Sequence, residues 1–597
     1  MARVSFWLIR FMIILLALSG GDSEASVVDT KHNLSSSGPG EIRAILEDQV
    51  CIFCHTPHNA APKTPLWNRA IDEGVNYVIY DSTTFNAKIS QPSGPSRLCL
   101  SCHDGTVGLG ALLSRPEGVT MTMGLMGRPS MLGTDLSNDH PFSFSYSEAL
   151  PFNVELHGTL PSELLFYNTD VVHCSTCHNP HDDTYGMFLS VSNKNAALCI
   201  LCHNVSGWQS SSHATSGKTW SRAGNNPWPL NARLTASQQR NTVAENGCEN
   251  CHTPHNAGGP QRLLNFLEEE KNCTFACHNG NVSDPGKNIS SQLIRSSAHP
   301  VDMATIGSAG TPHDPTEDVT FLHNHVECQD CHDPHSTYDN PAVAPFVSGS
   351  LTNVKGIDQA GSEQYPAAYE YEICFKCHSH TNTVVSYVNR YLDENDTRRE
   401  FATTNPSYHP VIGAGVNLDV PSLPSVTSPD QSMDEYSLIY CSDCHSGDDT
   451  AKIGGNGANG PHGSIYAPIL RERYERADGT SESYQSYALC YRCHDRTNLL
   501  ADQSFKRRTL GTTSSKGGHS GHTAVNGVSC SVCHDPHGVV DNSASGDHTH
   551  LINFDSTVVS PASGEIYPLF DDTGNFTGSC ALICHGVTHG SASHSYP

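Results

Sequence analysis

The stretch Cys51-Ile-Phe-Cys54-His55-Thr-Pro-His58 contains the pattern that repeats along this 597-residue chain. All 24 cysteines fall into close pairs, and a histidine follows the second cysteine of every pair. Ten pairs have two intervening residues and two pairs have three. The motifs are Cys51/Cys54/His55, Cys99/Cys102/His103, Cys174/Cys177/His178, Cys199/Cys202/His203, Cys248/Cys251/His252, Cys273/Cys277/His278, Cys328/Cys331/His332, Cys374/Cys377/His378, Cys441/Cys444/His445, Cys490/Cys493/His494, Cys530/Cys533/His534 and Cys580/Cys584/His585.

The spacing within each motif has a chemical explanation. Two thiols can add to the two vinyl groups on one edge of a haem, and a single backbone turn presents both sulfurs to that edge. The adjacent histidine then reaches the iron beneath the ring. One such motif is a moderate signal. Twelve motifs with no spare cysteine predict twelve covalently bound haems c, each holding one iron.

Three other uses of paired cysteines fit the pattern less well. A disulfide scaffold suits an exported chain with an even number of cysteines, but it does not require a histidine after every second cysteine. Structural zinc sites normally combine two cysteine pairs, or a cysteine pair with a histidine pair. A thioredoxin-like dithiol would need one pair rather than twelve.

The composition is poor in residues that form an ordinary core. Apolar residues make up 37% of the chain, whereas globular chains contain about 45–50% with glycine included. We therefore predict mostly irregular coil, with short helices and a few short strands, wrapped around a chain of haems. Residues 77–80 and 84–89 are expected as short strands, and residues 471–484 as partly helical.

The motifs alternate between two types, which predicts six tandem modules of two haems each. Odd-numbered motifs mostly continue as His-x-Pro-His, and the second histidines are His58, His181, His255, His335 and His537. The ninth motif lacks this extension, and His462 in Pro461-His462-Gly463 is its displaced equivalent. The predicted boundaries are 1–25 for a secretory signal, then 26–135, 136–208, 209–292, 293–400, 401–515 and 516–597 for the modules.

A further histidine lies upstream of each odd motif. These upstream histidines are His32, His140, His213, His299, His409 and His519, with His522 as the rival of His519. Together with the His-x-Pro-His histidines they provide twelve distal ligands for twelve irons, so two histidines can bind every iron. His380 and His589 are the remaining histidines best placed to displace one of these ligands. The others, including His157, His173, His313, His323, His325, His548, His550 and His594, are expected on the surface or supporting the ligands.

A steric argument predicts how the distal ligands are shared. In His-x-Pro-His the second histidine is three residues beyond the first, so it cannot reach the opposite face of the same haem. We expect it to bind the even-numbered haem of its own module. The upstream histidine would then bind the odd-numbered haem.

The N-terminus predicts export. Arg3 and Arg10 precede an apolar run at residues 11–18, and small residues follow up to a cleavage site after Ala25. This run is too short to span about 30 Å of hydrocarbon, so we expect no membrane span in the mature chain. The net charge of −27 disfavours nucleic acid and anionic lipid as partners.

The chain resembles the doubled-CxxCH multihaem c-type cytochromes of metal-reducing bacteria. The resemblance rests on residues 31–40, on Ser101-Cys-His-Asp-Gly-Thr106, on Asp139-His-Pro-Phe142 and on residues 578–586. It implies electron transfer in the periplasm or at the outer cell surface, in anaerobic respiration towards extracellular acceptors such as metal oxides. The partners that it implies are other cytochromes, an outer-membrane porin–cytochrome conduit, or further copies of the chain in a polymer.

Two functional classes compete. Irons bound by two histidines are low-spin and suit electron transfer, and no catalytic residue is then expected. A multihaem oxidoreductase of the nitrite or hydroxylamine type needs one iron with an open position. The best-known nitrite-reductase signature has lysine in place of the motif histidine, and no motif here does. We therefore predict an electron carrier.

Overall fold

A computed structural model describes residues 26–58, 60–61, 66–301, 326–379, 386–423, 433–503, 505, 518–542, 544–590 and 595–596. The predicted signal segment and His313, His323, His325, His380 and His594 lie outside these residues. The chain divides into two compact units. The first unit comprises Met1–Ser206, Ala214–Trp220 and Asn226–Leu267, and the second comprises Gly207–His213, Ser221–Asn225 and Glu268–Pro597. The finer division into six modules stays a prediction.

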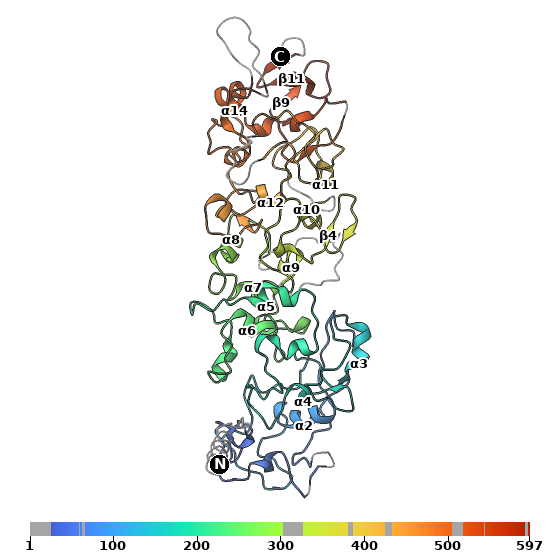
Figure 1. The fold of residues 1–597 in the computed structure, drawn as a ribbon, viewed down its shortest axis with the longest axis vertical. Coiled ribbons are helices and arrows are strands. Elements are labelled where there is room, and N and C mark those ends of the chain that lie inside the picture. Colours follow the sequence, from blue (N-terminus) through green and yellow to red (C-terminus); the bar gives the residue numbers. More distant parts are fainter. Residues whose placement is uncertain are drawn as a thin grey trace, which may run out of the picture. The chain divides into compact units, whose positions relative to one another are not determined.

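The predicted fold class is confirmed: coil predominates, and the helices are short (Figure 1). The helices are α2 (Gly94–His103), α3 (Tyr146–Ala149), α4 (Cys174–Cys177), α5 (Ser212–Thr215), α6 (Val243–Asn246), α7 (Glu269–Thr274), α8 (Ser290–Leu293), α9 (Cys328–Cys331), α10 (Glu370–Phe375), α11 (Thr397–Glu400), α12 (Cys441–Cys444), α13 (Ala488–Tyr491) and α14 (Arg496–Leu500). No helix in the described part of the chain has the length and apolarity that a membrane crossing needs.

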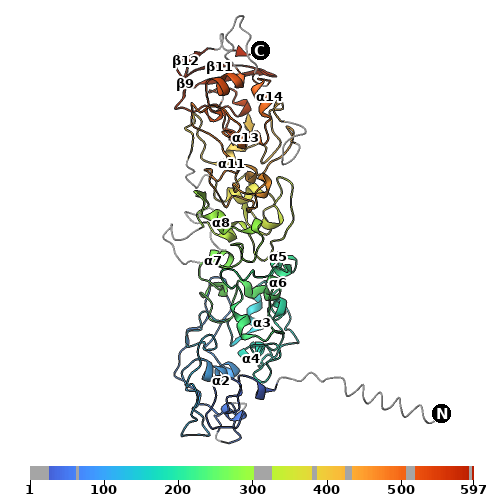
Figure 2. The same cartoon turned by 90° about the vertical axis from the view of Figure 1, so that its left-hand side faces the viewer.

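Helix α2 shows how the sequence limits these elements. Pro95 lies in its first turn, where a missing N–H costs nothing. Just beyond its end, Gly105 adopts a φ of 76°, the left-handed conformation that commonly terminates helices. Helix α2 packs beside α4, so the second and third motifs lie together in the first unit (Figure 2).

The strands are equally short except near the C-terminus. They are β1 (Phe144–Ser145), β2 (Val171–Val172), β3 (Ser297–Ala298), β4 (Gly356–Ile357), β5 (Glu363–Gln364), β6 (Ser407–Tyr408), β7 (Gly463–Ser464), β8 (Gly538–Val539), β9 (Val559–Pro561), β10 (Leu569–Gly574), β11 (Thr577–Cys584), β12 (Val587–His589) and β13 (Ser595–Tyr596). Strand β11 is the centre of a five-stranded sheet, and the other sheets are the pairs β1–β2, β3–β7, β4–β5 and β6–β8.

Three local predictions are wrong. Residues 77–80 and 84–89 form no strand, although Val78 makes an isolated bridge with Asp135. Side chains hold this segment instead: Gln91 accepts a hydrogen bond from the Tyr77 N–H, and Asp104 accepts one from the Tyr77 hydroxyl. Residues 471–484 are not helical, and Gly479 has a φ of 82° in their midst.

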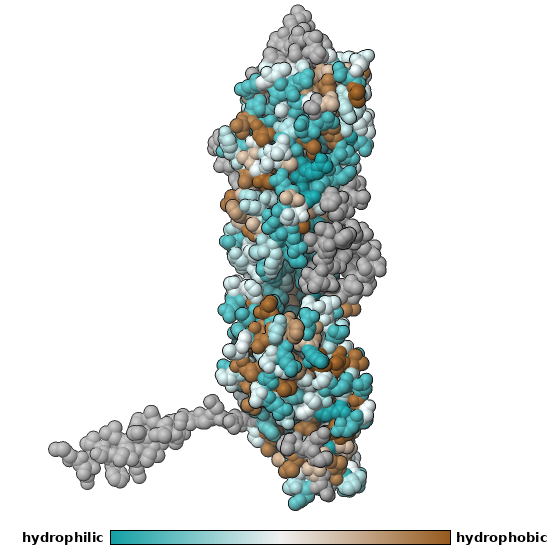
Figure 3. Space-filling view, turned by 90° about the vertical axis from the view of Figure 1, so that its right-hand side faces the viewer, coloured by the Kyte–Doolittle hydropathy of each residue, from teal (hydrophilic) through white to brown (hydrophobic). Residues whose placement is uncertain are grey.

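The buried apolar side chains form several small clusters instead of one large core. One cluster in the second unit contains Val532, Phe554, Val559, Phe570 and Leu582 beneath the C-terminal sheet. On the face drawn in Figure 3, apolar and polar residues are mixed. Side chains alone therefore provide little continuous apolar interior, as expected of a chain that wraps large apolar groups.

A buried arginine stabilises the loop after the second motif. Arg69 is 0% exposed and donates hydrogen bonds to the carbonyl oxygens of Leu109, Ser101 and Gly108 at 2.8, 3.1 and 3.0 Å. Each buried carbonyl that loses its donor costs roughly 1 kcal/mol or more. We expect Arg69→Leu to lower the free energy of unfolding by about 3 kcal/mol in urea denaturation. The exposed Arg43, replaced in the same way, is the control, and equal stability of the two variants would contradict this role.

Candidate haem sites

Each cysteine motif in the main pattern forms one tight turn. The carbonyl oxygen of Cys51 accepts a hydrogen bond from the backbone N–H of His55 at 2.9 Å. The same bond closes the motifs that begin at Cys174, Cys199, Cys248, Cys328, Cys374, Cys441, Cys490 and Cys530. The sixth motif has one more residue, yet Cys273 still accepts from the N–H of His278 at 2.9 Å. The longer spacing therefore leaves the turn closed.

The fifth motif has the same conformation as the first, fourth and eleventh motifs, in which the second cysteine also lies just beyond a short 3-10 helix. Cys248 lies inside the short 3-10 helix Gly247–Asn250, whereas Cys251 lies just beyond the end of this helix, with φ −120° and ψ −27°. The N–H of Cys251 still donates to the carbonyl oxygen of Cys248 at 3.1 Å. The Cys251 side chain is a half-buried thiol, and its predicted thioether bond to a haem stays a prediction.

The twelfth motif has a different conformation. Cys580 and Cys584 both lie on the extended strand β11, where residues four apart are separated by roughly 13 Å. The His585 side chain is 44% exposed, and its Nε2 atom lies 3.2 Å from Oδ2 of Asp478. Attachment of one haem to both thiols would require this strand to bend into a turn.

Ten predicted distal histidines face a predicted proximal histidine. The ring centres are 6.0 to 6.5 Å apart in every pair. The distal/proximal pairs are His181/His55, His32/His103, His255/His178, His140/His203, His213/His278, His462/His332, His299/His378, His537/His445, His409/His494 and His519/His534.

The distance within these pairs fits an iron between two imidazoles. A metal–nitrogen bond of about 2.0 Å, the length found in zinc–histidine sites, plus about 1.1 Å from nitrogen to ring centre gives about 6.2 Å for two rings. The described residues contain no group of three or more His, Cys, Asp or Glu side chains that could hold a metal ion. The pairs are therefore suited to a metal whose remaining ligands come from a macrocycle.

Burial keeps these rings in the form that binds iron. It lowers the pKa of His178, His203 and His278 to about 4, because the interior disfavours a charged imidazolium. A neutral imidazole has the free lone pair that a metal requires. These side chains are therefore neutral at physiological pH.

Backbone carbonyls orient the rings. The Nδ1 atoms of His178, His278 and His332 lie 2.9, 3.1 and 2.8 Å from the carbonyl oxygens of Met187, Lys287 and Ser350. Such a bond fixes the Nδ1–H tautomer, which leaves Nε2 free for a metal. His178 and His278 thus combine the distance, the neutral form and the supporting hydrogen bond that an axial ligand needs.

Neighbouring modules interlock where their distal histidines lie side by side. Strand β3 pairs with β7, and the N–H of His299 donates to the carbonyl oxygen of His462 at 3.2 Å. Strand β6 pairs with β8, and the N–H of His409 donates to the carbonyl oxygen of His537 at 3.0 Å. We call this arrangement the histidine clasp: an upstream histidine beside the His-x-Pro-His histidine, or its displaced equivalent, of the next module.

The clasp shows that the predicted sharing of distal ligands is wrong. His181, expected opposite His203, faces His55, and His32, expected opposite His55, faces His103. The reason is that the His-x-Pro-His segment runs beside the preceding module and points its histidine there. The same exchange is found for His140, His213, His255, His299, His409, His462 and His537.

The last module departs from this rule. In the sixth module His519 faces His534, as the sequence predicted. Its rival His522 faces His589 with ring centres 6.2 Å apart, so both upstream histidines have a partner. His585, the predicted proximal ligand, faces Asp478 instead.

Two predicted distal ligands, His58 and His335, and two proximal histidines, His252 and His585, remain outside the ten pairs. His58 is exposed and has no histidine facing it among the described residues. His213, expected opposite His252, faces His278, and His299 takes the place opposite His378 that was expected for His335.

The two types of pair differ in ring orientation. In the odd-numbered pairs, the ring planes of motifs one, three, seven, nine and eleven meet at 20°, 31°, 18°, 47° and 30°. In the even-numbered pairs, those of motifs two, four, six, eight and ten meet at 69°, 83°, 88°, 48° and 60°. The imidazoles are thus more nearly parallel in motifs one, three, seven and eleven and more nearly perpendicular in motifs two, four, six and ten, while motifs eight and nine are intermediate.

Consecutive motifs are neighbours within each unit. In the first unit, the thiols of Cys99 and Cys174 hydrogen-bond to each other and so join the second and third motifs. Cys374 and Cys441 join the eighth and ninth motifs of the second unit in the same way. The order of motifs in space therefore follows their order in the sequence at these points.

Several supporting residues were not predicted individually. Asp139 and Glu400 contact the Nδ1 atoms of His255 and His537 at 3.0 Å. Burial lowers the pKa of His537, but the Glu400 carboxylate outweighs it and raises that pKa to about 9. The sequence offered one signal for Asp139, because this residue directly precedes the predicted ligand His140.

Comparison with known proteins agrees with this geometry. Residues 169–206, which contain the third and fourth motifs, match the model of a family described as doubled CXXCH motif. No curated protein matches the chain. The matched segment thus carries the paired motif of multihaem c-type cytochromes, in which covalently bound haem c transfers electrons.

Proposed function

We propose that the chain is a dodecahaem c-type cytochrome that passes electrons along closely packed haems bound by two histidines. The observation that carries this proposal is the set of ten histidine pairs with ring centres 6.0 to 6.5 Å apart. Bound haem would supply an iron that changes between the ferric and ferrous states. The paired cysteines would attach the ring edge, the paired histidines would coordinate the iron, and backbone carbonyls would hold imidazoles such as those of His178 and His278 in one tautomer.

This arrangement favours a carrier over an oxidoreductase. An enzyme of the nitrite or hydroxylamine type needs an iron that substrate can reach, whereas paired imidazoles occupy both axial positions. The location proposed is the periplasm or the outer cell surface, and the electron acceptors are extracellular solids such as metal oxides. Support for this location comes from the apolar run at residues 11–18 and from the resemblance to cytochromes of metal-reducing bacteria.

The intact mass of the secreted protein tests the haem content. We expect the mature polypeptide plus twelve haems, and twelve haems per chain by the pyridine haemochrome assay. A mass equal to the polypeptide plus eleven haems, with Cys580 and Cys584 unmodified, would show that β11 stays extended and that the twelfth haem is not attached. A polypeptide mass without haem would overturn the proposal.

His58 favours a partner with its own haem, either a second copy of the chain or another cytochrome. Each of its counterparts His181, His255, His462 and His537 faces the odd-numbered proximal histidine of the preceding module. His58 belongs to the first module, and no described histidine faces it. We propose that it binds an iron of a docked partner.

Substitution of His58 tests that assembly. We expect His58→Ala to shift the secreted protein from assemblies to monomers in size-exclusion chromatography and electron microscopy. Haem content should stay unchanged, because the substitution leaves every pair within the chain intact, while the partner iron that His58 binds should become high-spin. Assemblies of the same size in the variant would contradict this role of His58.

A further inference from the structure

Among the ten paired distal histidines, His255 and His537 have a carboxylate as the partner of Nδ1, whereas others have a backbone carbonyl. The Nδ1 atoms of His32 and His213 lie 3.0 and 2.8 Å from the carbonyl oxygens of Pro180 and Pro334. By contrast, the Nδ1 atom of His255 lies 3.0 Å from Oδ1 of Asp139.

The second exception lies in the other compact unit. The Nδ1 atom of His537 is 3.0 Å from Oε2 of Glu400, the last residue of α11. His255 faces the third motif in the first unit, and His537 faces the ninth motif in the second unit. Each unit therefore has one distal histidine bonded to a carboxylate among its described residues.

Both carboxylates are removed from solvent. The side chain of Asp139 is 0% exposed, and that of Glu400 is 14% exposed. Oδ1 of Asp139 also accepts a hydrogen bond from the N–H of Asn256 at 3.3 Å. In this environment a negative charge acts strongly on its neighbours, because little water screens it.

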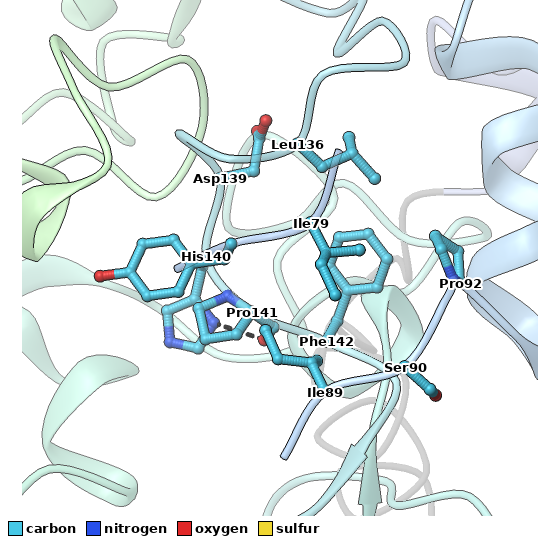
Figure 4. A pocket seen from close by; sticks show the side chains of 10 residues that line it. Ile79, Ile89, Ser90, Pro92, Leu136, Asp139, His140, Pro141 and Phe142 are labelled. Carbon is cyan, nitrogen blue, oxygen red and sulfur yellow. Dashed lines mark hydrogen bonds between the residues drawn. The ribbon is translucent and has the colours of Figure 1, made fainter. Parts of the chain in front are cut away.

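Asp139 and its neighbour serve two different sites. The Asp139 carboxylate and the His140 ring point away from each other (Figure 4). His140 faces His203 of the fourth motif, while Asp139 supports His255 opposite the third motif. The Asp139 carboxylate is thus placed to act on the third haem, whereas His140 faces the site of the fourth.

We propose that Asp139 and Glu400 are positioning residues that make the third and ninth haems the most reducing centres of their units. This inference rests on the proposed function, since it requires a haem iron between each histidine pair. A carboxylate that accepts the Nδ1–H bond draws the proton away from the ring and makes the imidazole a stronger donor to iron. The stronger donor and the nearby negative charge both favour the ferric state, so each potential falls.

The consequence is an uneven path for electrons. The third and ninth haems accept an electron last when the protein is reduced and lose it first when it is oxidised. Electrons then reside on the haems to either side, and each of these two centres is an uphill step between them.

Redox titration of the purified holoprotein tests the inference. Asp139→Asn and Glu400→Gln keep the size of each side chain but remove its charge. At a fixed potential we expect the ferrous-to-ferric ratio of the affected haem to rise about tenfold, which is about 59 mV for a one-electron couple. The most reducing step of the titration should move upward accordingly, once for each substitution.

Matched substitutions separate this effect from general loss of charge. Asp135→Asn removes an exposed carboxylate from the loop of Asp139. Glu394→Gln removes one that pairs with Arg399 at 3.1 Å. Neither contacts a paired histidine through any described bond, so both should leave the most reducing step in place. The conservative variants Asp139→Glu and Glu400→Asp retain an anionic acceptor and should keep the low potentials.

The outcomes distinguish this inference from the proposed function. An unchanged low-potential step in both neutral variants, with every haem still attached by mass, would overturn the inference alone. Control variants that shift the step equally would also overturn it. A wild-type protein without haem would instead contradict the proposed function. If the Asp139→Asn variant loses haem, the Glu400→Gln variant alone tests the inference, since the two sites lie in different units.

Discussion

Replacing His462 by alanine should leave one iron high-spin, and that iron should belong to the seventh motif. The ring of His462 lies 6.1 Å from that of His332, and the variant removes this second imidazole. We expect a new high-spin signal in the electron paramagnetic resonance (EPR) spectrum of the ferric protein, amounting to one iron per chain.

A second substitution identifies the haem concerned. In a background where Cys328 and Cys331 are alanines, the seventh haem cannot attach, and His462→Ala should add no high-spin signal. In a background where Cys490 and Cys493 are alanines, the tenth haem is missing and the signal should persist. A high-spin signal that persists without the seventh haem and disappears without the tenth would show that His462 binds the even-numbered haem of its own module. That result would contradict the histidine clasp.

The ferric protein should also show two families of low-spin EPR signals. Two parallel imidazoles donate into the same iron d orbital and separate it in energy from its partner, which gives a rhombic signal. Perpendicular imidazoles act on both orbitals equally and give a highly anisotropic signal. The ring planes meet at 18° for His332/His462 and at 88° for His278/His213, so both families are expected.

The relative size of the two families is part of this prediction. Odd-numbered motifs should contribute the rhombic signals and even-numbered motifs the anisotropic ones, in comparable amounts. Removing an even-numbered haem, for example through Cys199→Ala with Cys202→Ala, should reduce the anisotropic family alone. A single family of signals would show that the ring planes do not alternate in the holoprotein.

The sequence was sufficient to predict the fold class and the members of ten histidine pairs. Covalent chemistry restricts the spacing of cysteines and histidine within a motif, so local sequence contains that information. The low apolar fraction likewise excluded a large core. His519 opposite His534 was predicted correctly because both residues lie within one module.

Which histidines face each other could not be read from the sequence. The exchange of His32 and His181 depends on how one module runs beside the next, a long-range contact that spacing does not encode. The extended conformation of Cys580 and Cys584 depends on the partners of β11, namely β9, β10, β12 and β13. Glu400 is distant in sequence from His537, so only the folded chain reveals their hydrogen bond.

The histidine clasp gives the maturation of this protein a direction. A module that emerges first from the export machinery holds an odd-numbered haem whose second ligand is still to come. His55, for example, waits for His181, which lies 126 positions further along the chain. A nascent or truncated chain therefore ends in an incompletely ligated haem, and only the arrival of the following segment closes it.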